Sequence, residues 1–419
     1  MPIDPAKVRR QFPALQRPEA YFDNPGGTQV AKQCLDRIME YLIEDNANHE
    51  GAFATSRASD EIIARSRAAM ADFLNAARPE EILFGANMTS LAFHLARSLA
   101  RRLGPGDTIV VTRLDHDANI SPWLLLAEDR GCKVEWTDFI PEDGTLDLRS
   151  YERALESRPK LVAFGCASNA LGTINPVERM TEMAHQAGAL VFVDAVHYAP
   201  HGLIDVRAGG YDFLACSPYK FFGPHMGVLY GRRELLDELF AYKVRPASDA
   251  PPTKFETGTQ NHEAIAGLLG TLEYFEWLGR ECGQDEAAGL AGRFDGRALI
   301  FKQALAAIQT HEKGLAQDLL KALQYTPAAT IYGLTDPARF EERVPTFAFR
   351  LPNLSPRRIA EEMDKDGLFV WDGNYYALEV TRRLGVEDQG GMVRVGAAHY
   401  NTRDEIVRFG RSLARIARI

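Results

Sequence analysis

Between about residue 80 and residue 230, short apolar or β-branched runs alternate along the chain with longer stretches whose apolar residues recur at helical spacing. Seven short runs have the length and composition of strands: Ile82–Gly85, Thr108–Thr112, Lys133–Thr137, Leu161–Phe164, Leu190–Val193, Phe213–Ala215 and Gly227–Tyr230. Four longer stretches read as helices: Leu91–Arg102, Ile120–Arg130, Asp147–Glu156 and Val177–Ala187. This alternation is typical of a mostly parallel sheet with crossover helices, so the predicted fold class is α/β.

The pattern changes towards the end of the chain. The run Asn261–Thr310 reads as long, polar-faced and helical, and a mixture of shorter strands and helices follows it. We therefore predict an N-terminal segment and large domain over residues 1–284, and a smaller α+β domain over residues 285–419. No repeat or low-complexity linker marks the boundary, which depends only on the change of pattern.

Composition narrows the classes of function. The chain has 419 residues, of which 46% are hydrophobic and 25% charged, as in an ordinary globular enzyme. The net charge of −9 argues against nucleic acid or an anionic membrane as the main partner. The start lacks an apolar signal region and no apolar run approaches the roughly 20 residues of a membrane span, so we expect a cytoplasmic protein. Five scattered cysteines without a CxxC pair predict neither disulfides nor a metal site.

Polar residues follow several of the predicted strands, and ligands bind beyond the carboxyl ends of strands in open α/β sheets. The turn "GANMTS" follows the first strand and leads into a helix, whose free amides would suit a phosphate, although Asn87 or Thr89 could equally be an ordinary N-cap. His116 stands between two carboxylates in "RLDHDANISPW", and Asn169 stands in "CASNALGTINP".

Two further strand ends carry stronger candidates. Asp194 ends the apolar run "ALVFVD", where a carboxylate must be paired, cap a helix or face a pocket, and His197 follows it. Lys220 lies between the apolar run before "SPY" and a Gly-Pro loop, with aromatic residues on both sides. A lysine with no role beyond solubility at the surface is not expected to be flanked by aromatic residues on both sides.

This constellation resembles the fold-type I pyridoxal-phosphate enzymes, specifically the class V aminotransferase family and within it the cysteine desulfurase-like group. The resemblance extends over nearly the whole chain, from "YFDNPGG" at residues 21–27 to "YNTRDEI" at residues 400–406. It includes "DHDAN", "SNALGTINP", "VDAVH", "SPYKFFGP", "ETGT" and "RVG" in that order. It implies pyridoxal 5'-phosphate as the cofactor.

The resemblance also implies roles around the cofactor ring. Lys220 would form the Schiff base with the cofactor aldehyde and then act as the proton-moving base, which requires a lysine with a lowered pKa. Asp194 would pair with the pyridine nitrogen and strengthen the ring as an electron sink. His116 would stack on the ring. His197 stands where relatives usually carry a glutamine that binds the ring hydroxyl, and Asn169 would help from the other side.

The phosphate is assigned to the start of the helix after the first strand. The resemblance implies contacts from the backbone amides of Asn87 and Met88, with help from Thr89 and Ser217. Thr259 in "ETGT" is similar to the threonine that relatives contribute from a partner subunit, so the resemblance implies a homodimer.

Two more positions complete the implied site. Tyr219 occupies a place that is often histidine in relatives and keeps its hydrogen-bonding capacity. Arg394 in "GMVRVG" matches the arginine that holds the α-carboxylate of the substrate, for which a planar guanidinium is well suited.

One part of the chain departs from the cysteine desulfurases of this group, which carry a nucleophilic cysteine on a small-domain loop. When "VWDGNYYALEV" is aligned on Gly373, the arginine position reads Trp371 and the cysteine position reads Tyr376, and no cysteine follows Cys282. Tyr376 becomes a candidate substrate contact instead. Cys166 and Cys216 lie near the strand ends, but cysteines in apolar strands usually behave as small buried hydrophobes.

These observations favour a pyridoxal-phosphate enzyme that acts on an amino acid with a free α-carboxylate, most plainly a carbon-sulfur or β-elimination lyase that works without a persulfide. An aminotransferase, an epimerase or a kynureninase-like enzyme starts from the same chemistry and stays open. A non-catalytic cofactor-binding regulatory or assembly protein is the alternative of another class. The chain contains all three of Lys220, Asp194 and Arg394. This argues against the non-catalytic alternative, because a scaffold protein needs no arginine that binds a substrate carboxylate.

Overall fold

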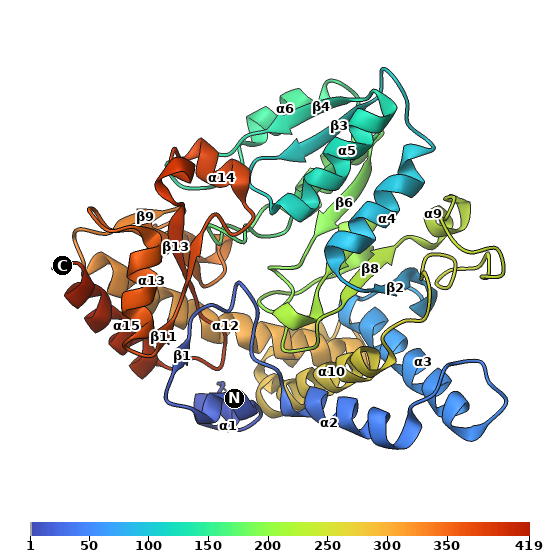
Figure 1. Ribbon diagram of the computed structural model, residues 1–419, viewed down its shortest axis with the longest axis horizontal. Coiled ribbons are helices and arrows are strands. Elements are labelled where there is room, and N and C mark those ends of the chain that lie inside the picture. Colours follow the sequence, from blue (N-terminus) through green and yellow to red (C-terminus); the bar gives the residue numbers. More distant parts are fainter. Residues whose placement is uncertain (1) are drawn as a thin grey trace.

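The computed structural model describes residues 2–419, and its largest sheet contains the seven predicted strands (Figure 1). In spatial order these are β2 (Ile82–Gly85), β8 (Gly227–Gly231), β7 (Phe213–Cys216), β6 (Leu190–Asp194), β5 (Leu161–Gly165), β3 (Thr108–Thr112) and β4 (Lys133–Thr137). β8 runs antiparallel to both of its neighbours, and the pairs from β7 to β4 are parallel. The α/β class and the mostly parallel sheet are therefore confirmed.

Helices cover both faces of this sheet, because its strands are apolar on both sides. In β3, Ile109 and Val111 face a core shared with α4 and α5, whereas Val110 faces the opposite core, which includes residues of α3, α7 and α10. The helices of this domain are α2 (Lys32–Glu40), α3 (Ala54–Leu74), α4 (Met88–Ala100), α5 (Ser121–Arg130), α6 (Leu148–Leu155), α7 (Val177–Gln186), α8 (Val206–Gly209), α9 (Arg233–Glu238) and α10 (His262–Cys282).

The long helical run predicted over Asn261–Thr310 is wrong in two respects. It is divided into α10 and α12 (Gly296–Gln324), with the short α11 (Ala287–Leu290) between them. Glycines at 283, 289 and 292 weaken helix in the interruption, and Asp295 is the N-cap of α12. α10 is also mostly buried rather than polar-faced, because it packs against α2, α3 and α12.

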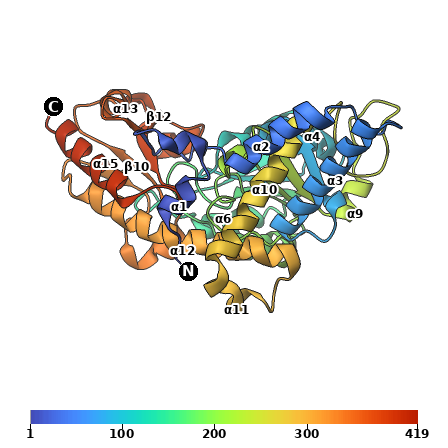
Figure 2. The same ribbon diagram turned by 90° about the horizontal axis from the view of Figure 1, so that it is seen from below.

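The small domain is an antiparallel four-stranded sheet with helices, in agreement with the predicted α+β composition. Its strands are ordered β12 (Trp371–Gly373), β13 (Met392–Gly396), β10 (Thr346–Arg350) and β9 (Thr330–Tyr332). Its helices are α13 (Pro356–Asp364), α14 (Leu378–Arg383) and α15 (Arg403–Ile416). α12 runs from beneath the large domain to the small one, where it packs against α15 (Figure 2).

The N-terminal segment, residues 2–28, lies beside the small domain (Figure 2). Its strand β1 (Ala20–Tyr21) pairs in parallel with β11 (Leu368–Phe369), and its helix α1 (Pro5–Arg9) is joined to α15 by the ion pair between Arg9 and Glu405. A domain boundary at residue 285 stays a prediction, with the N-terminal segment in contact with residues beyond it.

Two kinds of feature are absent from residues 2–419. None of their helices combines the length and the apolar character needed to cross a membrane. Nor do these residues bring together three or more His, Cys, Asp or Glu side chains in a group that could hold a metal ion.

Candidate active site

A cavity lies at the carboxyl ends of β3, β5, β6 and β7, next to the start of α4. It brings together every predicted cofactor contact except Thr259. Its lining residues are Asn87, Met88, Thr89, Asp115, His116, Ala118, Gly165, Ala167, Asn169, Asp194, Val196, His197, Ser217, Tyr219 and Lys220. Segments separated by up to about 130 residues of sequence therefore meet at one edge of the sheet, as the strand-end rule predicts.

The start of α4 is both a capped helix end and part of this cavity. Oδ1 of Asn87 accepts from the backbone N–H of Ser90 at 2.8 Å, so Asn87 is an N-cap. Within residues 2–419 no acceptor meets the amides of Met88 and Thr89. A Cβ on Gly227 would come within 2.4 Å of the carbonyl carbon of Asn87, so only glycine allows β8 to lie this close. The two free amides suit an anion.

Asp194 and Lys220 face the same cavity with opposite charges. Oδ1 of Asp194 accepts from the N–H of Val196 at 2.8 Å. Burial raises the pKa of Asp194 to about 6, although that N–H and Lys220 act against the shift. The amine of Lys220 donates to the carbonyl of Pro25. Burial and then Arg394 lower the pKa of Lys220 to about 7, against the opposing charges of Asp194 and Asp23.

The two histidines of the cavity are held by different contacts. Nδ1 of His116 accepts from the N–H of Ala118 at 3.0 Å, and burial, Lys220 and Arg394 lower the pKa of His116 to about 4. Nε2 of His197 lies 3.1 Å from Oγ1 of Thr346, and burial holds the pKa of His197 well below its usual value. Both imidazoles are therefore neutral near pH 7, which suits stacking and hydrogen bonding to a ring.

Arg394 lies on β13, next to this cavity. Asn169 lines the cavity and also contacts Arg394. Nη1 of Arg394 donates to the carbonyl of Asn169 at 2.9 Å, and its guanidinium lies 4.5 Å from the ring centre of Tyr375. It is 3% exposed, its Nε has no partner, and it forms no ion pair with a carboxylate of residues 2–419. Burial lowers the pKa of Arg394 to about 10, so it remains charged at pH 7. A buried cation without a carboxylate partner is a ready site for an anionic group.

The loop after β12 closes over the histidine side of the site. Tyr376 is 74% exposed, and its ring stacks on His116 with centres 5.5 Å apart. The carbonyl of Tyr376 accepts from the N–H of Asp117 at 2.7 Å, and that of Tyr375 accepts from Nδ2 of Asn169 at 2.9 Å. Both tyrosines have φ near +57°, which is uncommon for such side chains. Tyr375 belongs to the core, whereas Tyr376 and the half-exposed Trp371 do not.

Three further residues considered from the sequence lie outside this cavity. Thr259 lines a separate cavity that also contains Phe84, Ser90 and His94. Cys166 and Cys216 are 2% and 0% exposed and belong to the core on the side of Val110. Burial raises the pKa of both thiols, so neither has thiolate character near pH 7.

The sequence reasoning missed two carboxyl groups near the site, the buried Asp115 and the half-buried Asp23. Asp115 lines the cavity and accepts from the hydroxyl of Thr112 at 2.6 Å, and burial raises its pKa to about 8. Asp23 has an unpartnered Oδ1, and its pKa is raised by burial against the pull of Arg394 and Lys220. Asp115 was visible only as a neighbour of His116, and Asp23 lies in "YFDNPGG", where the resemblance begins but from which no role was assigned to it.

The arrangement fits pyridoxal phosphate on observations independent of the resemblance. The free amides of α4 offer an anion site in the cavity lining, and Asp194, in the same lining, offers a carboxylate for a pyridinium. Oδ1 of Asn169 is buried without a donor, so a group within the cavity is needed to satisfy it. Lys220 supplies an amine whose lowered pKa suits covalent chemistry.

Comparisons with known proteins show the family of this chain. The profile of the family "Aminotransferase class-V" matches residues 20–297 and 281–409. The chain is 34% identical over 411 residues to the aminotransferase-like protein FGM3 of Gibberella zeae, covering 95% of each chain. It is 32% identical over 433 residues to a cysteine desulfurase of Serratia proteamaculans, covering 99% of this chain and 98% of the other.

Solved structures of cysteine desulfurases have the same fold as this chain. The apo structure of cysteine desulfurase from Thermococcus onnurineus is similar with a TM-score of 0.87 and 28% identity over 100% of both chains. Cysteine desulfurase CsdA from Escherichia coli, with an S-sulfonic acid, has a TM-score of 0.82 and 26% identity, covering 99% of this chain and 98% of that one. The chain therefore belongs to the aminotransferase class-V family of pyridoxal-phosphate-dependent enzymes, in which the cysteine desulfurase-like group is the part it resembles.

Proposed function

We propose that this enzyme eliminates a group from the β-carbon of an amino acid, with cysteine or a related sulfur compound as the substrate class. The observation that carries the proposal is the presence in one site of Lys220, an amine of lowered pKa, and Arg394, a buried guanidinium that forms no ion pair within residues 2–419. The first can move a proton at the α-carbon, and the second can hold an α-carboxylate.

The cofactor contacts follow from the lining of the cavity. The amides of Met88 and Thr89, with Ser217, would hold the phosphate, and Lys220 would hold the cofactor through its amine. Bound pyridoxal phosphate supplies an electron sink for the carbanion at the α-carbon. Asp194 would keep the ring nitrogen protonated, because its folded pKa of about 6 leaves it ionised at neutral pH.

The remaining groups orient the ring and exclude water. His116 would stack on it from the side that Tyr376 covers, and His197 and Asn169 would contact its hydroxyl. Tyr219 packs flat against His225 with ring centres 4.9 Å apart, which keeps it beside Lys220. The dry surroundings strengthen each of these electrostatic contacts.

The absence of a cysteine at the aligned loop position distinguishes two possible fates of the substrate sulfur, which are transfer to an enzyme thiol and release as a free product. Tyr376 stands at the aligned position, Cys166 and Cys216 are buried with raised pKa, and no cysteine is among the described residues that line the cofactor cavity, so the proposed reaction uses no thiol to receive sulfur. In the proposed reaction cysteine and water give pyruvate, ammonia and hydrogen sulfide, and the sulfur leaves as the free product. Lys220 takes the α-proton, and the C–S bond electrons leave with the sulfur.

Transamination is the second candidate, supported by the similarity to the aminotransferase-like protein FGM3 of Gibberella zeae. We also infer a homodimer in which Thr259 reaches the cofactor of the partner, because in its own chain it lies outside the cofactor cavity. A cytoplasmic location is part of the same proposal.

The test is a panel of amino acids added to the purified protein with its cofactor, followed by absorbance and by analysis of products. Elimination requires pyruvate and ammonia without any added keto acid, whereas transamination requires an acceptor keto acid. Borohydride reduction should fix the cofactor on Lys220, and mass spectrometry that finds it on another lysine would overturn the site. Absence of any spectral response to every amino acid would favour the non-catalytic alternative.

A further inference from the structure

The N-terminal segment ends in the turn Asn24–Thr28, which reaches the active site. The carbonyl of Pro25 accepts from the amine of Lys220, and the N–H of Thr28 donates to the carbonyl of Tyr219 at 3.0 Å. A Cβ on Gly26 would lie 3.5 Å from Nη2 of Arg394, so the turn also approaches the carboxylate site. One short turn therefore meets both residues on which the proposed chemistry depends.

Buried hydrogen bonds hold this turn on both sides of Pro25. Asn24 is 3% exposed, and its amide is directed at the carbonyls of Tyr21 and Gly396, at 2.9 and 2.8 Å, and at Oδ1 of Asn401 at 3.0 Å. The hydroxyl of the fully buried Tyr400 donates to Oδ1 of Asn24 and accepts from the N–H of Gln29 at 3.1 Å. Such a satisfied buried network favours one backbone position.

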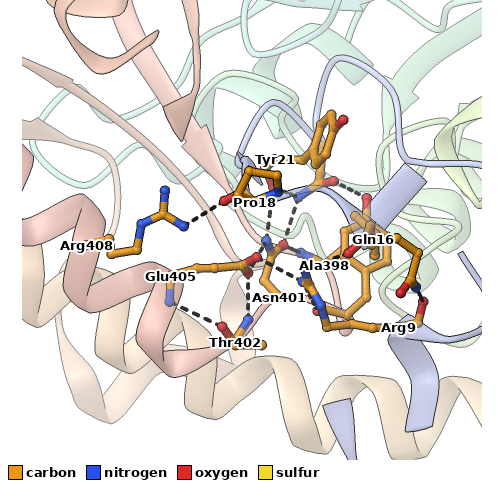
Figure 3. A network of polar contacts seen from close by, with 12 residues as sticks. Arg9, Gln16, Pro18, Tyr21, Ala398, Asn401, Thr402, Glu405 and Arg408 are labelled. Carbon is orange, nitrogen blue, oxygen red and sulfur yellow. Dashed lines mark hydrogen bonds and ion pairs between the residues drawn. The ribbon is translucent and has the colours of Figure 1, made fainter. Parts of the chain in front are cut away.

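The same network continues outward to the start of α15. Figure 3 shows Asn401 between Tyr21 and Glu405: its amide donates to the carbonyl of Tyr21 and to Oε2 of Glu405, each at 3.1 Å. Glu405 also accepts from the N–H of Thr402 at 2.9 Å and from Arg9 at 2.9 Å. The position of the turn is thus set by residues of α1 and α15, far from the cavity in sequence.

The amine of Lys220 has one hydrogen-bond acceptor within residues 2–419, and that acceptor is the carbonyl of Pro25. The charged and titratable groups that act on the amine are Asp23, Asp194 and Arg394, with His116 and His197. They set its charge, but none of them forms a hydrogen bond to it. The orientation of the Lys220 amine therefore depends on the carbonyl of Pro25.

We propose that Asn24 and Tyr400 are positioning residues for Lys220: they hold the carbonyl of Pro25 where it receives the amine whenever the amine is not bonded to the cofactor. The proposal rests on the proposed role of Lys220. A lysine that alternates between the cofactor and a free amine needs a defined place in its free state, and this carbonyl supplies one without adding charge. The proton-moving step would then start from one orientation of the amine.

The experiment measures Lys220 in the protein freed of cofactor. Trace acetylation with acetic anhydride across pH 5–10, read by mass spectrometry, gives the midpoint at which Lys220 becomes reactive. Tyr400→Phe keeps the ring and removes the hydroxyl that joins Asn24 to Gln29. A displaced carbonyl no longer favours the ammonium form, so we expect the midpoint to fall by about 0.5 to 1 pH unit. In the loaded enzyme, kcat should fall several-fold with KM nearly unchanged.

Arg408→Ala is the matched control. Arg408 also ties the N-terminal segment to α15, through the carbonyl of Pro18 at 2.9 Å, but it does not touch the turn (Figure 3). In the Arg408→Ala protein, the pH midpoint of Lys220 acetylation should equal that of the wild type. Asn24→Ser should shift the midpoint in the same direction as Tyr400→Phe.

An unchanged midpoint in folded Tyr400→Phe and Asn24→Ser proteins would overturn the proposal, and so would loss of cooperative unfolding in both, which would show that the network only supports the fold. An adduct of the cofactor on a lysine other than Lys220 would instead refute the proposed function. The two failures are therefore distinguishable, because the labelling requires neither cofactor nor turnover.

Discussion

Replacing Arg394 by alanine tests the proposed carboxylate site directly. Arg394 already uses Nη1 for the carbonyl of Asn169, and its Nε has no partner in residues 2–419. A substrate carboxylate would therefore gain charge-assisted hydrogen bonds from a guanidinium that is fixed in place by Asn169 and by the ring of Tyr375. Hydrogen bonds to charged groups contribute about 1.5–3 kcal/mol each, and water entering the vacated space recovers part of that.

We expect a net loss of about 3 kcal/mol, which is roughly a 100-fold weaker binding of the amino acid. A second effect follows from charge, because Arg394 is the second largest cause of the lowered pKa of Lys220. Without the guanidinium the pKa of Lys220 should rise above about 7, so any step that needs the neutral amine should move to higher pH.

The assay is a spectral titration of the loaded enzyme with an amino acid and with the amine that lacks its carboxylate. Wild type should prefer the amino acid, and Arg394→Ala should lose that preference while binding the amine as before. Arg350→Ala is the control, since Arg350 donates to the carbonyls of Gln389 and Gly391 and does not line the cavity. If the ratio of the two dissociation constants is the same in Arg394→Ala as in wild type, Arg394 does not hold the carboxylate.

Three further predictions concern other residues. Thr259→Ala should weaken cofactor retention by about 0.5–3 kcal/mol in equilibrium dialysis, and a monomer that retains cofactor in sedimentation would contradict the dimer. Replacing Cys166 and Cys216 together by alanine should leave turnover of cysteine largely intact, and a persulfide trapped on either thiol would show a desulfurase instead. Burial lowers the folded pKa of Lys302 to about 7, against about 10.4 when unfolded, so the unfolded state binds more protons between these values. The free energy of unfolding should therefore rise more steeply between pH 7 and pH 9 in wild type than in Lys302→Met, as measured by urea titration, and equal slopes would refute this.

The strands and most of the cofactor contacts could be predicted from the sequence because both have local signatures. β3 is five consecutive apolar or β-branched residues bounded by polar turns, and its predicted limits agree with the structure. Asp194 is the last residue of β6 and Lys220 lies in the turn after β7, and parallel strands end at one edge of a sheet. The limits of α10 and α12 were predicted less well, since helical periodicity alone does not show where glycines and a cap interrupt a run.

Other features depended on tertiary structure. Pro25 and Tyr375 reach the site through tertiary contacts: the carbonyl of Pro25 meets the amine of Lys220 across 195 residues of sequence, and the carbonyl of Tyr375 meets Asn169 across 206. The raised pKa of Asp115 and the lowered pKa of Lys220 likewise come from burial by neighbours that are remote in sequence. The chain by itself therefore determined which elements form and which residues end the strands. Only the packing of the N-terminal segment, the sheet and the small domain determined which of those residues meet, and in which charge state, since desolvation and hydrogen bonding act between groups brought together by the fold.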